Sequence, residues 1–191
     1  MGSAPSSVTG TRHAGNEISL SKSEVSRVKK LFHQLDSDNK GLVQLSKVTQ
    51  LPHLKNNVLA KLVASQYVKK QHVPEEEDVT EEECLDVEKF IELFDLLSPK
   101  KSVQSKLEVT FAALKDKDSD KITPQGLLNY FKLLLPSGIP PVNLESVVTS
   151  LYHQLYHKED GDSSQHDEMS LENFVKVVNK VEILARLNVQ V

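Results

Sequence analysis

The chain has 191 residues, enough to bury a sizeable core as one domain or as two small lobes. Charged residues make up 26% and apolar residues 38%, as in a soluble globular protein, and a net charge of -4 without a gathered patch of lysine and arginine argues against nucleic acid as the main partner. A single cysteine excludes an internal disulfide, and no apolar run approaches the roughly 20 residues that span a bilayer. We therefore expect a cytoplasmic location, with peripheral membrane contact only if a lipid is attached.

The N-terminus begins Met-Gly-Ser-Ala-Pro-Ser, which matches the pattern for N-myristoylation at Gly2. A chance match or a cloning remnant would give the same six residues, so both interpretations stay open. One myristoyl chain binds a membrane only marginally, and the nearby basic residues Arg12, Lys22 and Lys29 are too sparse to make a second anchor. Residues 1–20 are rich in Ser, Gly and Thr without apolar periodicity, and are expected to form a flexible arm.

Helical spacing of apolar side chains begins after this arm. Val25, Val28, Phe32 and Leu35 predict an amphipathic helix over residues 23–35, which a short loop and a second helix follow. The same helix–loop–helix pattern recurs, giving four units at intervals of about 37 to 47 residues, and this favours an internal duplication. A generic helical bundle with chance spacing is the alternative.

Each unit can be aligned on a loop of twelve positions, the length of a calcium-binding hand. Position 8 of such a loop is apolar and pairs with the partner loop in a short β ladder. In the four units this position holds Val43, Leu85, Ile122 and Met169. The residue after position 12 begins the buried face of the next helix, and it is Val48, Phe90, Leu127 or Phe174. We therefore predict an all-α fold in which paired loops are joined by short β ladders.

The loops lack most of the oxygen ligands that calcium needs. A hand surrounds the ion with oxygens from positions 1, 3, 5, 7 and 9 and with a bidentate glutamate from position 12. The first loop offers Asp36 and Asp38 at positions 1 and 3, but Lys40 stands at position 5 and Lys47 at position 12. We predict that these two lysines neutralise the two aspartates and hold the loop without an ion.

The other three loops have the same defect. Their position 12 holds Lys89, Gly126 or Asn173. The second loop is preceded by the acidic run EEEDVTEEE, interpreted as a solvated charge run, and the third has Lys115 at position 1. The fourth keeps two aspartates in a loop that is too long. No cofactor is expected, and weak calcium binding is confined to vestigial acids of the first and fourth loops, which are Asp36, Asp38, Asp160 and Asp162.

Catalytic or zinc chemistry has little support in the sequence. There is no nucleophile elbow, phosphate loop or metalloprotease motif, and Cys84 lies in an acidic stretch that would raise its pKa. His153 and His157 are spaced for one helix face, with His166 beyond, but no cysteine or nearby acid completes a zinc site convincingly. A solvated helix face is the simpler interpretation, and we expect no enzyme activity.

Several segments together give the chain a resemblance to a known family. They are the N-terminal start, LFHQLDSDNKG, LPHLKNN, KITPQGLLNYFKLLL, FVKVVNKVEI and the terminal LNVQV. In this order they resemble the calcineurin B family, which includes the calcineurin B homologous proteins and, more distantly, the calcium- and integrin-binding proteins. The resemblance implies two lobes of paired EF-hands, an N-terminal pair at 21–98 and a C-terminal pair at 99–191. The missing ligands, an insertion at 70–83 and the long fourth loop depart from the family pattern.

Members of this family are non-catalytic regulatory subunits. The resemblance implies that the chain holds an amphipathic helix of a larger protein, either a calcineurin-type Ser/Thr phosphatase catalytic subunit or the tail of a sodium/proton exchanger. The groove residues that it implies are Leu51, Leu54, Phe94, Phe131, Leu134, Leu135, Val177 and Val178. Burial of these residues in the interior core is the alternative. Since the loops lack ligands, binding is expected to be constitutive; a residual calcium sensor and a light-chain-like cytoskeletal component stay open as other functions.

Overall fold

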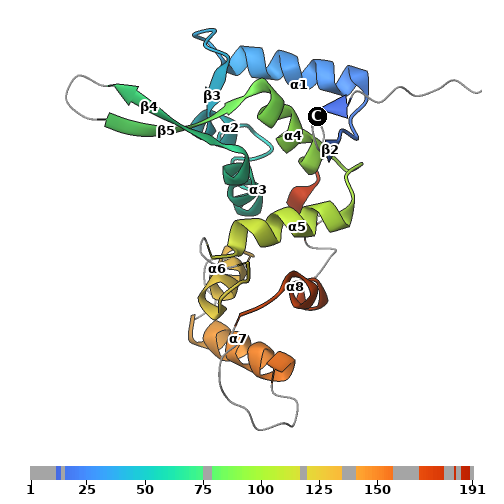
Figure 1. The fold of residues 1–191 in the computed structure, drawn as a ribbon, viewed down its shortest axis with the longest axis vertical. Coiled ribbons are helices and arrows are strands. Elements are labelled where there is room, and N and C mark those ends of the chain that lie inside the picture. Colours follow the sequence, from blue (N-terminus) through green and yellow to red (C-terminus); the bar gives the residue numbers. More distant parts are fainter. Residues whose placement is uncertain are drawn as a thin grey trace, which may run out of the picture.

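The computed structural model describes residues 12–13, 16–74, 79–116, 120–134, 141–156, 168–178, 183 and 186–189. Several sequence-based expectations lie outside these residues, namely those at Gly2, Leu135, His157, Asp160, Asp162 and His166. Figure 1 shows a mostly helical chain with a small antiparallel sheet at one side, an arrangement consistent with an EF-hand-like fold.

The first half of the chain contains four helices, a single 3-10 turn and a three-stranded sheet among the described residues. After two short paired strands, β1 (Arg12–His13) and β2 (Asn16–Glu17), the elements are α1 (Lys22–Leu35), β3 (Leu42–Gln44), α2 (Leu45–Thr49), α3 (Val58–Ala64), η1 (Ser65–Tyr67), β4 (Lys69–Pro74), β5 (Val79–Asp86) and α4 (Val87–Leu97). The second half contains α5 (Val103–Leu114), α6 (Pro124–Leu134), α7 (Pro141–Tyr156) and α8 (Leu171–Val177).

The first helix forms where its sequence predicts it. Ser21 caps α1 by accepting a hydrogen bond from the backbone N–H of Glu24, whose carboxylate in turn accepts the N–H of Ser21 at 2.7 Å. The helix buries Val28 and Phe32 against the core, and it ends at Leu35 with Asp36 as its C-cap. The predicted amphipathic helix over residues 23–35 is therefore confirmed to within one residue.

The predicted pairing of loops is confirmed in both halves. Val43 lies opposite Leu85 where β3 pairs with β5, and both side chains are buried. Ile122 and Met169 form an isolated antiparallel bridge with N···O distances of 2.9 and 2.7 Å. The Tyr152 hydroxyl donates a further hydrogen bond to the Ile122 carbonyl. Apolar residues at position 8 thus join two loops that are distant in sequence.

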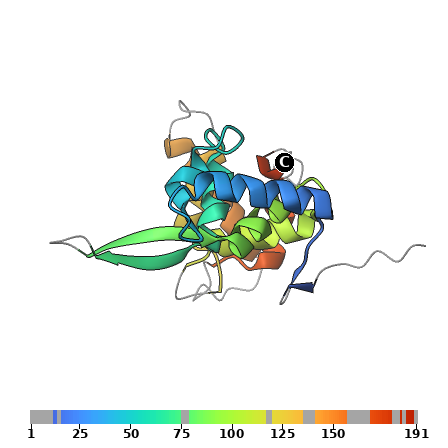
Figure 2. The same cartoon turned by 90° about the horizontal axis from the view of Figure 1, so that it is seen from above.

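The insertion at 70–83 forms a β-hairpin, which the sequence did not predict. β5 is the central strand of the order β3-β5-β4, and the hairpin of β4 and β5 extends from one side of the molecule (Figures 1 and 2). From Val79 onward the run EEEDVTEEE, interpreted as a solvated charge run, lies in β5, and Glu83 within it is exposed. The β4 backbone provides a hydrogen-bonding partner, and the register places Lys70 opposite Glu83, a pairing of opposite charges that favours the strand.

The aromatic residues that flank the loops pack in the interior. Phe32 meets Phe90 edge-on with ring centroids 5.4 Å apart, and Phe90 meets Phe94 at 4.7 Å. In the second half Phe174 contacts Phe111 at 5.7 Å and Tyr130 at 5.8 Å. Helices that are distant in sequence are therefore joined by ring contacts. Over the described part of the chain, no helix is both long and apolar enough to cross a membrane.

Candidate partner-binding site

Hydrogen bonds from its own backbone to Asp36 hold the first loop closed. Asp36 is buried, and its two carboxylate oxygens accept hydrogen bonds from the backbone N–H groups of Lys40 at 3.0 Å and Gly41 at 2.9 Å. The turn needs left-handed backbone, with φ of 52° at Asn39 and 72° at Gly41, conformations that asparagine and glycine adopt at low cost. The Asp36 carboxylate thus holds the loop in shape through hydrogen bonds from the backbone of the loop itself.

The predicted roles of the two lysines in this loop are only partly correct. The Lys40 ammonium lies 3.9 Å from the Asp38 carboxylate, and both side chains are largely exposed, so the pair contributes little. The Lys47 ammonium instead donates to the backbone carbonyl of Leu35 at 3.4 Å. Asp36 is satisfied by backbone amides, because these lie within the turn itself and reach the carboxylate without ordering a long side chain.

Lysine side chains also bind the acids of the second loop. Asp86 caps α4 by accepting the N–H of Lys89, and its other oxygen receives the Lys69 ammonium at 2.5 Å. Burial raises the pKa of Asp86, but the hydrogen bonds from Lys69 and from the Lys89 backbone outweigh it, so the pKa lies below its usual value. The Lys89 side chain pairs with Glu92 at 2.7 Å and not with the loop.

The third loop contains a comparable ion pair. Lys115, at its first position, binds Asp120 at 2.7 Å, and this contact lowers the pKa of the aspartate. Gly126, at its last position, lies so close to the Leu114 carbonyl that an added Cβ would be 3.0 Å from that oxygen. A glutamate at position 12 would therefore crowd the backbone. Among the described residues no cluster of three or more His, Cys, Asp and Glu side chains could hold a metal ion.

Three of the predicted groove residues line one pocket in the first half of the chain. Leu51, Leu54 and Phe94 enclose a pocket of about 310 Å³. The other lining residues are Arg27, Leu31, Pro52 and His53. The pocket lies between α1, the turn after α2 and the last part of α4. A concave, mostly apolar site of this volume suits one or two bulky side chains of a partner.

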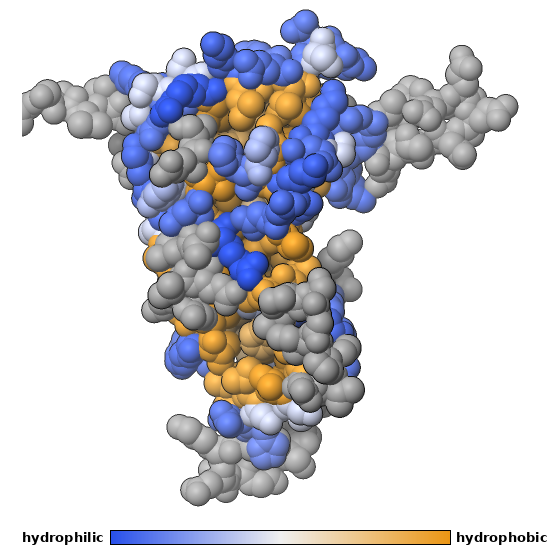
Figure 3. All heavy atoms as spheres, turned by 180° about the vertical axis from the view of Figure 1, so that it is seen from behind, coloured by the Kyte–Doolittle hydropathy of each residue, from blue (hydrophilic) through white to orange (hydrophobic). Residues whose placement is uncertain are grey.

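The remaining predicted groove residues lie in the second half of the chain. Phe131 and Leu134 are on α6, Val177 ends α8 and Val178 follows it. Leu134 and Val178 are buried with exposed fractions of 9% and 7%, whereas Phe131 and Val177 are half-buried. Figure 3 shows apolar surface in an upper and a lower area of one face of the molecule, with hydrophilic residues between them. The buried members belong to the core, and the half-buried ones can also contact a partner.

The C-terminal segment lies between the two halves of the chain. Ile183, Leu187 and Val189 are buried, and the Val189 N–H donates to the carbonyl of Leu97 at the end of α4. Arg186 contacts both halves, because its guanidinium donates to the Leu134 carbonyl at 2.6 Å and its carbonyl accepts a hydrogen bond from Asn57. These contacts fasten the segment to α6 and to the start of α3, beside the predicted groove residues of both halves.

A buried lysine holds the same segment from α5. Lys106 has no exposed surface, and its ammonium donates to the carbonyls of Leu187 at 2.6 Å and Ser98 at 2.9 Å and to the side chain of Asn188. Burial among these neutral groups lowers the pKa of Lys106 to about 8. Sequence analysis missed this residue, although its place on the same helix face as Thr110, four residues later, could have revealed it.

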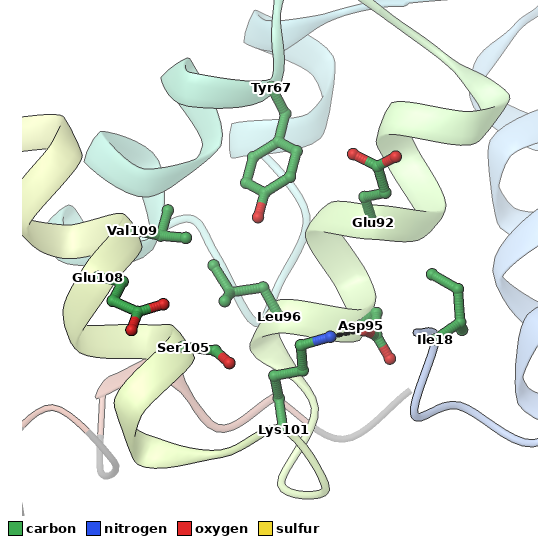
Figure 4. A pocket seen from close by; sticks show the side chains of 9 residues that line it. All are labelled: Ile18, Tyr67, Glu92, Asp95, Leu96, Lys101, Ser105, Glu108 and Val109. Atoms are coloured by element: carbon green, nitrogen blue, oxygen red, sulfur yellow. Dashed lines mark hydrogen bonds and ion pairs between the residues drawn. The ribbon is translucent and has the colours of Figure 1, made fainter. Parts of the chain in front are cut away.

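The segment before α1 is held by a second buried charge. Asp95 on α4 accepts hydrogen bonds from the Ser19 N–H and hydroxyl at 2.7 and 2.6 Å and from the Leu20 N–H, and it pairs with Lys101. Ser19 and Leu20, the last residues of the expected flexible arm, are therefore packed against α4. Figure 4 shows the ion pair of Asp95 and Lys101 beside a small pocket of about 80 Å³ that Tyr67 also lines.

Burial shifts the pKa values of two groups in the first half of the chain. Burial raises the pKa of Tyr67 to about 12, and the carboxylates of Glu92 and Asp95 add to the shift. Burial likewise raises the pKa of the Cys84 thiol, with a further contribution from Glu82, as the acidic stretch led us to expect. Both groups are therefore protonated at neutral pH, which makes Cys84 a poor nucleophile.

A mostly helical chain whose loops pair through short antiparallel bridges is consistent with an EF-hand-like fold. No known family model matches this chain. A solved chain of the Chaetomium theromophilum TREX2 CID domain complex covers 83% of this chain and 90% of its own length, with 15% identity and a TM-score of 0.31, which is too low to indicate a shared fold.

Calcineurin B proteins are similar to this chain over most or all of its length. The calcineurin B protein of Candida glabrata is 24% identical over 193 residues, covering 100% of this chain and 98% of the relative. Its counterpart in Kluyveromyces lactis is 24% identical with the same coverage, and that in Naegleria gruberi is 23% identical over 90% of this chain and 88% of its own length.

Proposed function

We propose that the chain is a non-catalytic, calcineurin B-like regulatory subunit that holds an amphipathic helix of a larger protein, without needing calcium. The pocket formed by Leu51, Leu54 and Phe94 is the observation that carries this proposal. It provides apolar walls from three separate segments, which is what the face of a guest helix requires. The names of the similar proteins favour a phosphatase catalytic subunit as the owner of that helix.

In this proposal residues 21–98 and 99–191 are two lobes of paired EF-hands. The pairs Val43–Leu85 and Ile122–Met169 support it, since each joins two loops of one lobe. The half-buried Phe131 and Val177 extend the groove into the second lobe. Gly2 is proposed as a site of myristoylation that allows reversible membrane contact, in line with the N-terminal pattern.

Independence from calcium follows from the way the loops are closed. Calcium-loaded sensor hands open their helix pairs and expose a groove. Here Asp36 already accepts two backbone hydrogen bonds, and Lys115 stands at the first position of the third loop. Because these loops are held by protein groups, partner binding does not wait for an ion.

Co-precipitation with the full-length chain tests the proposal. The partner recovered should be a phosphatase catalytic subunit, and the same amount should be recovered with calcium or with a chelator. Leu51→Asp places a charge in the pocket and should reduce recovery at least about tenfold, since a buried unpaired carboxylate is costly. Val58→Asp is the matched control, because Val58 is 40% exposed and does not line the pocket.

Recovery of a different partner would indicate a different function. Recovery of an exchanger tail would keep the helix-holding role and change the partner, whereas a cytoskeletal protein would favour a light-chain-like function. Partner binding that Leu51→Asp leaves unchanged would refute the pocket as the binding site.

A further inference from the structure

The pocket that Leu51 lines carries positive charge and no negative charge. Arg27 from α1 and His53 from the turn after α2 are its titratable lining residues, and both are exposed. No carboxylate is among the residues that line it. A guest side chain in this pocket would therefore meet apolar walls and a cationic edge.

The two elements that carry Arg27 and His53 are also basic. The third element, α4, contains three acids, Glu88, Glu92 and Asp95, of which Glu92 is paired with Lys89 and Asp95 with Lys101. Helix α1 carries Lys22, Arg27, Lys29 and Lys30 against one glutamate, and all four cationic side chains are exposed. The glutamate, Glu24, is already bound to Lys100 at 2.5 Å. The turn over residues 50–57 adds the exposed Lys55 and contains no acid. This part of the surface is thus cationic in a chain whose net charge is -4.

We propose that the partner of this pocket is an acidic amphipathic helix, in which glutamate or aspartate flanks the bulky apolar residues that enter the pocket. The inference rests on the proposed function and names the chemistry of its guest. Arg27 is suited to the contact, since its guanidinium offers paired N–H donors to a carboxylate. The lysines of α1 add long-range attraction that speeds the encounter and selects against basic helices.

Two synthetic helices can test this charge preference. Both are peptides of about 18 residues, or five helical turns, with the same stripe of leucine and phenylalanine, and the positions that flank the stripe are glutamate in one and lysine in the other. Binding to the full-length chain is measured by fluorescence anisotropy at low salt. The net charge of -4 would by itself favour the lysine peptide, so a preference for the glutamate peptide reports the local charge at the pocket.

We expect the glutamate peptide to bind about fivefold tighter, and the preference to shrink as salt is added. Arg27→Glu should abolish or reverse the preference. Lys40→Glu is the matched control with the same change of charge; Lys40 is exposed and lies outside the pocket, so the preference should persist.

The remaining outcomes separate this inference from the proposed function. If both peptides bind equally and Leu51→Asp abolishes binding, the pocket holds helices but the acidic partner is refuted. If neither peptide binds, the proposed function fails and the inference fails with it. If the chain binds neither peptide but binds phosphatidylserine vesicles, and Arg27→Glu abolishes that binding, the basic surface faces a membrane and the acidic helix is refuted.

Discussion

Lys106 donates a hydrogen bond from its ammonium to the backbone carbonyl of Leu187, at 2.6 Å and across 81 positions of the chain. The lysine has no exposed surface, and its other acceptors, on Ser98 and Asn188, are also neutral. The C-terminal segment is thereby tied to the end of α4 and the start of α5. Its contacts with Asn57 at the start of α3 and with Leu134 of α6 place it between the two halves of the chain.

Replacing Lys106 by methionine should destabilise the protein. Methionine fills much of the space but leaves the carbonyls of Ser98 and Leu187 without their donor, at about 1–3 kcal/mol for each buried group left unpaired. Relief of the buried charge offsets part of this, so we expect a net loss of about 2 kcal/mol in the free energy of unfolding by urea. Lys29→Met, on the exposed face of α1, should change it by less than about 0.5 kcal/mol. Equal losses in the two variants would contradict the role of the buried ammonium.

The same lysine should give stability a dependence on alkaline pH. Its pKa is about 8 in the folded chain and 10.5 in the unfolded one, so the unfolded chain binds more protons between these values. The wild-type free energy of unfolding should therefore rise relative to that of Lys106→Met as pH increases from about 8 to about 10.5. Unfolding both proteins at a series of pH values measures this difference, and a constant gap would show that the pKa is unshifted.

Removing the Asp36 carboxylate should weaken the first loop whether calcium is present or not. Asp36→Ala leaves the N–H groups of Lys40 and Gly41 without an acceptor and should cost about 1–2 kcal/mol. Asp38→Ala is the control, because Asp38 is mostly exposed and its contacts, a hydrogen bond from the Ser37 hydroxyl at 3.1 Å and an ion pair with Lys40 at 3.9 Å, lie at the surface. Calorimetry of the wild-type chain should show no heat with calcium at physiological concentrations. Stabilisation of the wild type by calcium, lost in Asp36→Ala, would instead reveal a working site.

The first turn of α1 should be sensitive to acid. Hydrogen bonds from Lys100 and Ser21 lower the pKa of Glu24 to about 2, below its ordinary value of 4.5. A carboxylate with a lowered folded pKa stabilises the fold above the ordinary pKa, and that contribution is lost as pH falls from about 4.5 toward 2. Glu24→Gln should therefore reduce the slope of stability against pH in this window. Glu145→Gln, on the exposed side of α7, should leave it unchanged.

Apolar periodicity predicted the local structure well. Val28 and Phe32 are the buried face of α1, and the loop residues Val43, Leu85, Ile122 and Met169 pair as expected, because burial of these side chains is required wherever the loops meet. The hairpin of β4 and β5 could not be predicted in the same way. Its acidic sequence carries no strand pattern, and β5 becomes a strand because β3 and β4 supply backbone partners on both sides.

The candidate site was predicted only in part. Leu51, Leu54 and Phe94 do share a pocket, but no sequence pattern indicated that Arg27 would line it, since α1 and the turn after α2 meet only in the folded chain. Leu54 and Phe94 also show why a groove cannot be inferred from apolar residues alone. Both are almost fully buried, so the same side chain supports the core and forms a wall of the pocket.

The sequence by itself determined the helix–loop–helix units, the loop residues that pair and the loss of calcium ligands, because each depends on residues close together in the chain. Only the tertiary structure decided what holds the first loop closed and what joins the two halves of the chain. The Asp36 carboxylate accepts hydrogen bonds from backbone amides of its own loop, and the Lys106 ammonium donates hydrogen bonds to Leu187 and Asn188 near the C-terminus. A buried carboxylate or ammonium needs hydrogen-bond partners within about 3 Å. Which groups lie that close depends on how the chain folds and cannot be inferred from neighbouring residues in the sequence.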